Sequence, residues 1–136
     1  MISTTGPSEP PRVLLVDDND EIIALARTTI APTCVVVGTA TDGPSALRAA
    51  KDLRPDVIVL DISLKNMTGF EVAANLRDSG SMAAIVFLSL YAENNFVVKA
   101  RDIGAIGYVV KTRLVSDLMH AVTEAHMGRE FISPLC

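Results

Sequence analysis

The sequence predicts an α/β fold in which helices cover both faces of a parallel β-sheet. Short apolar runs alternate along the chain with segments of helical periodicity, which is the order expected of parallel strands joined by helices. Hydrophobic residues make up 49% of the 136 residues and aromatic residues only 4%. The core is therefore aliphatic, as in sheets that are buried on both faces. A chain of this length is expected to form one domain.

The first strand is expected at residues 12–17 (RVLLVD), an apolar run that ends in acid. Polar residues 19–20 can cap the helix that follows, whose apolar positions continue at helical spacing to Ile30. Pro32 stops that helix because proline cannot continue it. Residues 34–40 (CVVVGTA) are rich in valine and predict the second strand.

The middle of the chain repeats this alternation. A turn at 42–44 (DGP) leads into a helix at 45–53, which Pro55 ends. Residues 56–61 (DVIVLD) form a third apolar run that again ends in acid. A polar loop then opens a helix within residues 66–77. The third strand is thus expected between two helices.

The last third supplies two more units. Residues 83–89 (AAIVFLS) predict the fourth strand, and the helix at 92–103 is stopped by Gly104. A short fifth strand is expected at 107–111 (GYVVK), followed by an amphipathic helix at 114–126. Right-handed connections between parallel strands then give a doubly wound parallel sheet. We expect its class to be flavodoxin-like (βα)5 with strand order 2-1-3-4-5, which is one of the common doubly wound orders.

The ends and the overall charge restrict the classes of protein. Residues 1–11 are expected to be a disordered lead-in, 12–127 the folded domain, and 128–136 a tail or the start of a linker. A net charge of -4 with a pI of 5.0 argues against a nucleic-acid surface. The chain shows neither a signal pattern nor an apolar run near the roughly 20 residues of a membrane span. These features predict a cytoplasmic protein without membrane contact.

Polar side chains follow four of the expected strands at their carboxyl ends. Asp17 and Asp18 close the first strand, Asp61 the third, Ser89 the fourth and Lys111 the fifth. Ligands of open parallel sheets bind beyond these strand ends. Three clustered carboxylates require a cation, and oxygen ligands suit Mg²⁺. A carboxylate beside a metal, an amine and a hydroxyl makes a coherent site for accepting a phosphoryl group.

Each of these residues has an ordinary structural interpretation when taken alone. Paired aspartates after a strand commonly cap helices, and a lysine at a strand end is usually a solvated charge. The combination of acid, acid, hydroxyl and amine at four strand ends of one sheet is what favours a phosphate site.

The sequence resembles the receiver domains of bacterial two-component response regulators over about residues 12–127. The stretches that carry the resemblance are VLLVDDND, VIVLDISLKNMTGFEV, IVFLSLYAEN and GAIGYVVK. Leu90 and Tyr91 after the serine, together with the ISP tail, are most similar to receivers of LuxR-type transcription factors.

The resemblance implies a role for each residue at the strand ends. Asp61 is implied to be the phosphoacceptor, with Mg²⁺ held by Asp18, Asp61 and the Ser63 carbonyl, and by Asp17 through water. Lys111 is implied to pair with the acceptor and then with the phosphoryl group. Ser89 is implied to hydrogen-bond the phosphoryl group, and Tyr108 to be the aromatic switch that moves inward with it.

The resemblance also implies partners and points of difference. The phosphoryl donor is implied to be a phosphohistidine on a histidine kinase. Dimers are expected through the surface of the fourth helix, fifth strand and fifth helix, or through the first and fifth helices. DNA contact is expected only where a helix-turn-helix domain follows Cys136. Lys65 stands where proline is frequent and Leu90 where a small residue is frequent, while Ser63 and Tyr91 are expected to tune dephosphorylation.

Three other functions stay open at this point. The chain is a candidate for a receiver-like binding module that ignores phosphate, although the intact acidic set argues against this. A phosphatase with an aspartate nucleophile usually carries a second acid two residues further on, where this chain has Ser63. A cofactor-binding flavodoxin-like protein needs a phosphate-cradling loop after the first strand, and that loop is not evident.

Overall fold

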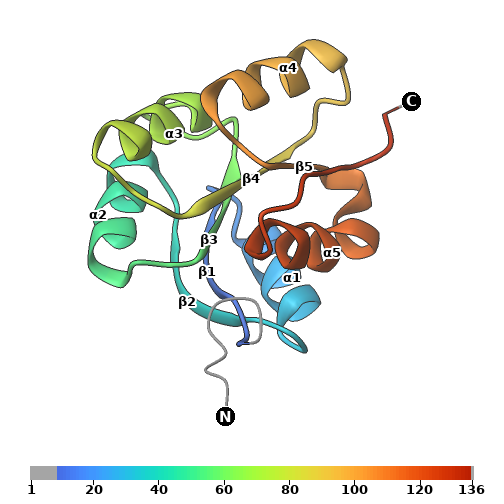
Figure 1. Ribbon diagram of the computed structural model, residues 1–136, viewed down its shortest axis with the longest axis horizontal. Coiled ribbons are helices and arrows are strands. Elements are labelled where there is room, and N and C mark those ends of the chain that lie inside the picture. The colour runs from blue at the N-terminus through green and yellow to red at the C-terminus, as the bar shows by residue number, and fades with distance from the viewer. Residues whose placement is uncertain (1–8, 136) are drawn as a thin grey trace.

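The protein is described by a computed structural model that covers residues 9–135. Six parallel strands form one sheet in the order β2-β1-β3-β4-β5-β6 (Figure 1). The expected order 2-1-3-4-5 is therefore confirmed for the first five strands. The strands are β1 (Arg12–Val16), β2 (Val35–Ala40), β3 (Val57–Asp61), β4 (Ala84–Ser89), β5 (Gly107–Val110) and β6 (Phe131–Ile132).

Helices cover both faces of the sheet, as the aliphatic strands predict. The helices are α1 (Asp20–Ile30), α2 (Gly43–Leu53), α3 (Gly69–Asp78), α4 (Asn94–Ile103) and α5 (Leu114–His126), with a short 3-10 turn η2 (Lys111–Arg113) before α5. Helices α2, α3 and α4 pack on one face through a cluster that includes Leu14 and Phe87. Helices α1 and α5 pack on the other face with Leu15 and Leu88. Successive residues of a strand thus point into the two cores on opposite faces of the sheet.

Local sequence signals set where the helices begin. The Asn19 side chain accepts the backbone N–H groups of Glu21 and Ile22, which caps α1 as expected. Thr68 and Glu71 form a reciprocal capping box that starts α3 at Gly69. These caps place the N-terminal ends of α1 and α3 beyond the carboxyl ends of β1 and β3. The polar strand-end residues were expected at this edge of the sheet.

The C-terminal tail departs from the expectation of a five-stranded sheet followed by a tail or linker. Residues 131–132 pair with β5 in parallel, Phe131 with Gly107 and Ile132 with Tyr108. A two-residue strand has no periodicity that a sequence pattern can reveal. The predicted lead-in at 1–11 lies largely outside the described residues.

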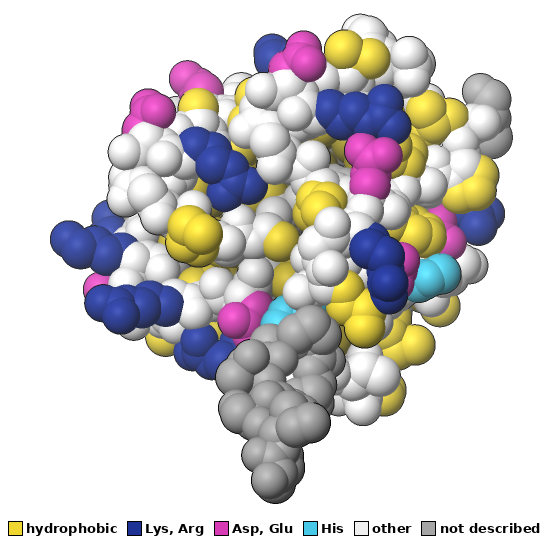
Figure 2. Space-filling model, viewed as in Figure 1, with side chains coloured by type: hydrophobic (Ala, Val, Ile, Leu, Met, Phe, Trp, Pro, Cys, Tyr) yellow, Lys and Arg dark blue, Asp and Glu magenta, His cyan; other side chains and the backbone are white. Residues whose placement is uncertain are grey.

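Charge is distributed without a dominant basic stripe on the face drawn in Figure 2, where basic side chains are scattered among acidic and apolar ones. Among the described residues, none of the helices is both long and apolar enough to cross a bilayer.

Candidate functional site

The sheet register brings the polar strand-end residues together. Val16 pairs with Leu60, so Asp17, which follows β1, lies beside Asp61 at the end of β3. Ser89 pairs with Val110, which places Lys111 one residue beyond the same edge. The structure therefore assembles Asp17, Asp61, Ser89 and Lys111 at the carboxyl edge of the sheet, where the sequence predicted them.

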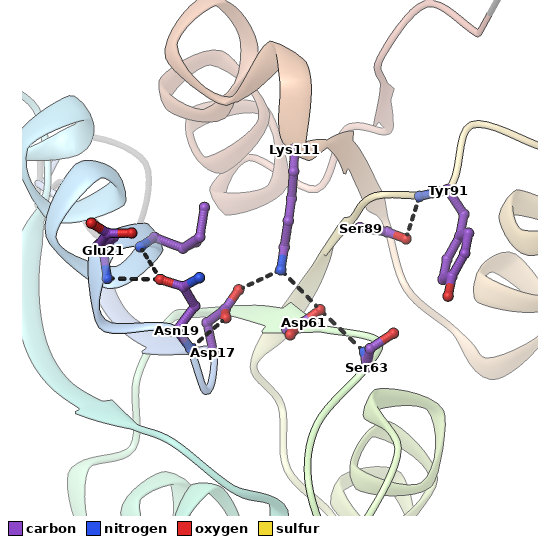
Figure 3. A network of polar contacts seen from close by, with 9 residues as sticks. Asp17, Asn19, Glu21, Asp61, Ser63, Ser89, Tyr91 and Lys111 are labelled. Carbon is purple, nitrogen blue, oxygen red and sulfur yellow. Dashed lines mark hydrogen bonds and ion pairs between the residues drawn. The ribbon is translucent and has the colours of Figure 1, made fainter.

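Lys111 lies between two buried carboxylates (Figure 3). Its Nζ is 2.9 Å from Asp17 Oδ2 and 3.3 Å from Asp61 Oδ1. The side chains of Asp17 and Asp61 are only 2% and 4% exposed, and that of Lys111 is 11% exposed. Charge attraction is weakly screened in such a setting, so the amine is held tightly by both acids.

Burial and neighbouring charges perturb the acid and the amine. Burial raises the pKa of Asp61, and the nearby charge of Asp17 raises it further, while the Ser63 N–H and Lys111 partly oppose the increase. For Lys111, burial lowers the pKa, but hydrogen bonds and attraction from Asp17 and Asp61 outweigh it and leave the pKa raised. The pocket thus holds more negative charge than one lysine offsets, which favours a cation.

Backbone groups orient both carboxylates. The Asn19 N–H donates to Asp17 Oδ1 at 2.9 Å, and the Ser63 N–H donates to Asp61 Oδ1 at 3.1 Å. Sequence reasoning found Asn19 only as a helix cap and missed its contact with Asp17. The Asn-Asp cap directly after a strand ending in paired acids is the signal that could have indicated it.

Gly69 is a second residue of the site that sequence reasoning missed. Its N–H donates to the Ile62 carbonyl at 2.7 Å. A Cβ at this position would lie 2.8 Å from Ile62 Cα and would collide with the Asp61 carbonyl. Glycine therefore allows the start of α3 to pack directly against the backbone that carries Asp61.

The acidic cluster fits a divalent cation. One carboxylate oxygen each from Asp17, Asp18 and Asp61 lies within 4.8 Å of the others. Asp17 Oδ2 is buried and contacts the Lys111 amine at 2.9 Å. Carboxylate oxygens of this kind suit Mg²⁺, either directly or through a metal-bound water. The Ser63 carbonyl as a further ligand stays a prediction.

Ser89 and Tyr108 both form hydrogen bonds with the backbone of Tyr91. The Ser89 hydroxyl accepts the Tyr91 N–H at 3.0 Å, and the Tyr108 hydroxyl donates to the Tyr91 carbonyl at 2.7 Å. Tyr108 is 1% exposed, so its ring already lies inside. Burial raises the pKa of Tyr108. Tyr91 itself stacks on Phe96 with ring centroids 4.5 Å apart.

The departures noted in the sequence lie around this pocket. Leu90 is 69% exposed, so most of its side chain faces solvent. The backbone at Lys65 forms a bridge with Asp42, which rests the loop after Asp61 on the start of α2. The effects of Leu90 and Lys65 on the rate of the chemistry stay predictions.

The sheet order and the acidic edge define the class of protein. The chain belongs to the response regulator receiver domains, whose family model matches residues 13–123. It is the receiver domain of a two-component response regulator, a signalling family, and the expected likeness to LuxR-type regulators is confirmed by the relatives.

Particular relatives support this assignment. The chain is 34% identical over 127 residues to the nitrate/nitrite response regulator NarL of Escherichia coli K12, covering 92% of this chain and 59% of NarL. The Response regulator GacA of Pseudomonas aeruginosa is 30% identical over 129 residues, which cover 90% of this chain and 58% of GacA. The chain thus spans less than two thirds of the length of these relatives.

Solved structures agree in fold. A LuxR-family two-component response regulator from Aurantimonas sp. SI85-9A1 superposes with a TM-score of 0.87 at 30% identity, covering 93% of this chain and 91% of that one. The receiver domain of a response regulator NarL from Mycobacterium tuberculosis gives a TM-score of 0.84 at 30% identity, covering 89% and 99%.

Proposed function

We propose that Asp61 accepts a phosphoryl group from a phosphohistidine of a histidine kinase. The observation that carries the proposal is the nearly complete burial of Asp61 beside Asp17 and Lys111. The Lys111 amine lies 3.3 Å from Asp61 Oδ1 and 2.9 Å from Asp17 Oδ2. An oxygen of Asp61 attacks phosphorus as the bond from phosphorus to the imidazole nitrogen breaks, and the imidazole leaves with that electron pair.

Asp18, Asp61 and the Ser63 carbonyl are the proposed direct ligands of Mg²⁺, and Asp17 acts through a bound water. When bound, Mg²⁺ offsets negative charge on the phosphoryl oxygens. Lys111 offsets part of the negative charge of the acids before transfer and pairs with the phosphoryl group after it. The Asn19 and Ser63 N–H groups hold the two carboxylates in place while this occurs.

Ser89 and Tyr108 are the proposed switch. The phosphoryl group brings added negative charge and oxygen acceptors next to the end of β4. In the proposed response, the Ser89 hydroxyl turns to donate to a phosphoryl oxygen, which favours the inward ring of Tyr108 and its bond to the Tyr91 carbonyl. The surface of α4, β5 and α5 then signals the state to an output.

The proposed output is transcription. NarL is a response regulator that extends well beyond the length matched by this chain. By analogy, we propose that a DNA-binding domain follows the receiver in this protein. We also propose homodimers that form through α4, β5 and α5 or through α1 and α5. Ser63 and Tyr91 are proposed to set how long the phosphoryl group persists.

The acceptor is tested by incubating the full chain with Mg²⁺ and a small acyl phosphate, and measuring bound phosphate by intact mass spectrometry. We expect one phosphoryl group per chain, none in Asp61→Asn, and the wild-type amount in Asp78→Asn, whose acid lies at the exposed end of α3. Phosphate uptake by Asp61→Asn at wild-type stoichiometry would refute the assignment.

The rival functions give other results in the same preparation. A receiver-like module that ignores phosphate would show no Mg²⁺ binding in a titration and no phosphorylation. A phosphatase would turn over a phosphate ester repeatedly and lose that activity in Asp61→Asn. The buried, lysine-paired site favours the receiver over both.

A further inference from the structure

The segment Glu130–Ser133 contacts all three elements of one surface. Glu130 makes a two-pronged ion pair with Arg101 of α4, at 2.8 and 3.1 Å. Ile132 pairs with Tyr108 of β5, and the Ser133 N–H donates to the Tyr108 carbonyl at 2.8 Å. Figure 1 shows the red C-terminal tail passing β5 between α4 and α5. The segment therefore covers the free edge of β5.

Ser133 is anchored in a buried polar site. It is 1% exposed, its hydroxyl donates to Asp117 Oδ2 at 2.7 Å, and it accepts the Val110 N–H at 3.2 Å. Asp117, on α5, is 6% exposed and is held by Arg113 at 2.8 and 3.2 Å. A buried hydroxyl with both a donor and an acceptor partner is a specific attachment rather than a loose contact.

Apolar contacts complete the attachment. The Phe131 ring lies 5.0 Å from the His120 ring on α5. Ile132 packs against the core cluster that contains Tyr108 and Val97. Both side chains are half-buried, so the segment is held by moderate apolar burial and by the Ser133 site.

The residues that hold the segment belong to the strand that serves the acidic site. Tyr108 accepts Ser133 through its carbonyl, and its hydroxyl reaches the Tyr91 carbonyl beside Ser89. Val110, which donates to Ser133, directly precedes Lys111. Docking of the segment thus fixes β5 at Tyr108, the proposed switch residue itself, and at Val110, the residue before Lys111.

We propose that Glu130–Ser133 is an intramolecular ligand of the surface formed by α4, β5 and α5, and that its docking is thermodynamically coupled to phosphoryl binding at Asp61. The coupling rests on the proposed function of Asp61. In the proposed active state the segment is docked and the Tyr108 ring points inward. A phosphoryl group at Asp61 therefore strengthens docking, and docking strengthens phosphoryl binding by the same factor. The segment that leads out of the domain then carries the signal itself, and a second copy that uses the edge of β5 must displace it.

The test uses the full chain with Mg²⁺ and the phosphoryl mimic BeF3⁻. Ser133→Ala removes the hydroxyl that links Val110 to Asp117. Ser79→Ala is the matched control, because its hydroxyl bonds only the Leu76 carbonyl within α3 among the described residues. Glu130→Gln weakens an exposed ion pair and supplies a second variant should Ser133→Ala not fold. Amide hydrogen exchange at Val110 and Ser133 reports docking, and titration of BeF3⁻ reports the site.

We expect BeF3⁻ to slow exchange at both amides in the wild type. In Ser133→Ala we expect faster exchange and an affinity for BeF3⁻ reduced about fivefold, the size of one buried hydrogen bond. Ser79→Ala should change neither measurement, and Glu130→Gln should shift both in the same direction by less than Ser133→Ala.

Two outcomes would overturn the coupling. One is faster amide exchange in Ser133→Ala with BeF3⁻ affinity within twofold of the wild type, which would make β6 a static extension of the sheet. The other is amide exchange at Ser133 that BeF3⁻ does not change in the wild type. If BeF3⁻ fails to bind the wild type at all, the proposed function of Asp61 fails instead, so the two failures are distinguishable.

Discussion

Replacing Lys111 by methionine tests whether the lysine holds the acidic pocket together. The substitution keeps the volume of the stem and removes the amine that contacts Asp17 at 2.9 Å and Asp61 at 3.3 Å. Two carboxylates that are 2% and 4% exposed then face each other without a cation. Breaking a buried ion pair costs about 3–5 kcal/mol. Because the Lys111 side chain is 11% exposed and Asp61 can take up a proton, we expect a loss near the lower limit, about 3 kcal/mol.

The assay is urea unfolding of Lys111→Met at neutral pH, with and without Mg²⁺. A cation that binds only the folded pocket restores stability by mass action, so Mg²⁺ should recover more stability in the variant than in the wild type. Lys51→Met, at an exposed position on α2, is the control and should stay within about 0.5 kcal/mol of the wild type. A loss below about 1 kcal/mol for Lys111→Met would refute the reasoning, because that is the size of a solvent-screened surface pair.

Two further predictions follow from local geometry. Gly69→Ala places a methyl group 2.8 Å from Ile62 Cα and against the Asp61 carbonyl, so it should lower the free energy of urea unfolding by about 1–3 kcal/mol and reduce phosphorylation of Asp61. Unchanged stability would contradict the close approach. The hydrogen bond from Arg113 lowers the pKa of Asp117. An acid with a lowered folded pKa stabilises the fold above its unfolded pKa of about 3.9, and this contribution is lost as pH falls through the folded pKa. Asp117→Asn should therefore flatten the acid side of the stability profile measured by urea unfolding, and an unchanged slope would exclude that contribution.

Much of the fold could be predicted because its signals are local. The apolar runs before Asp17 and Asp61 are long enough to predict buried strands, and the cap at Asn19 marks a helix start. Once the strands are parallel, their carboxyl ends share one edge, so Asp17, Asp61 and Lys111 had to be near one another.

Other features depend on contacts between residues far apart in the chain. The two-residue strand β6 exists because the edge of β5 offers unpaired backbone groups to Phe131 and Ser133. The need for glycine at position 69 comes from the approach of α3 to the backbone at Asp61, which no local pattern around Gly69 reveals.

The sequence by itself determined the α/β class and the identity of the acids, hydroxyl and amine at the strand ends, because periodicity and caps act within a few residues. Only the tertiary structure decided how those groups meet. It placed Lys111 between two buried carboxylates, turned Tyr108 inward onto the Tyr91 carbonyl, and attached Ser133 to Asp117. Distances and burial of this kind arise when segments far apart in the chain pack together. They determine the direction in which the pKa of Asp61 shifts and where the C-terminal segment docks.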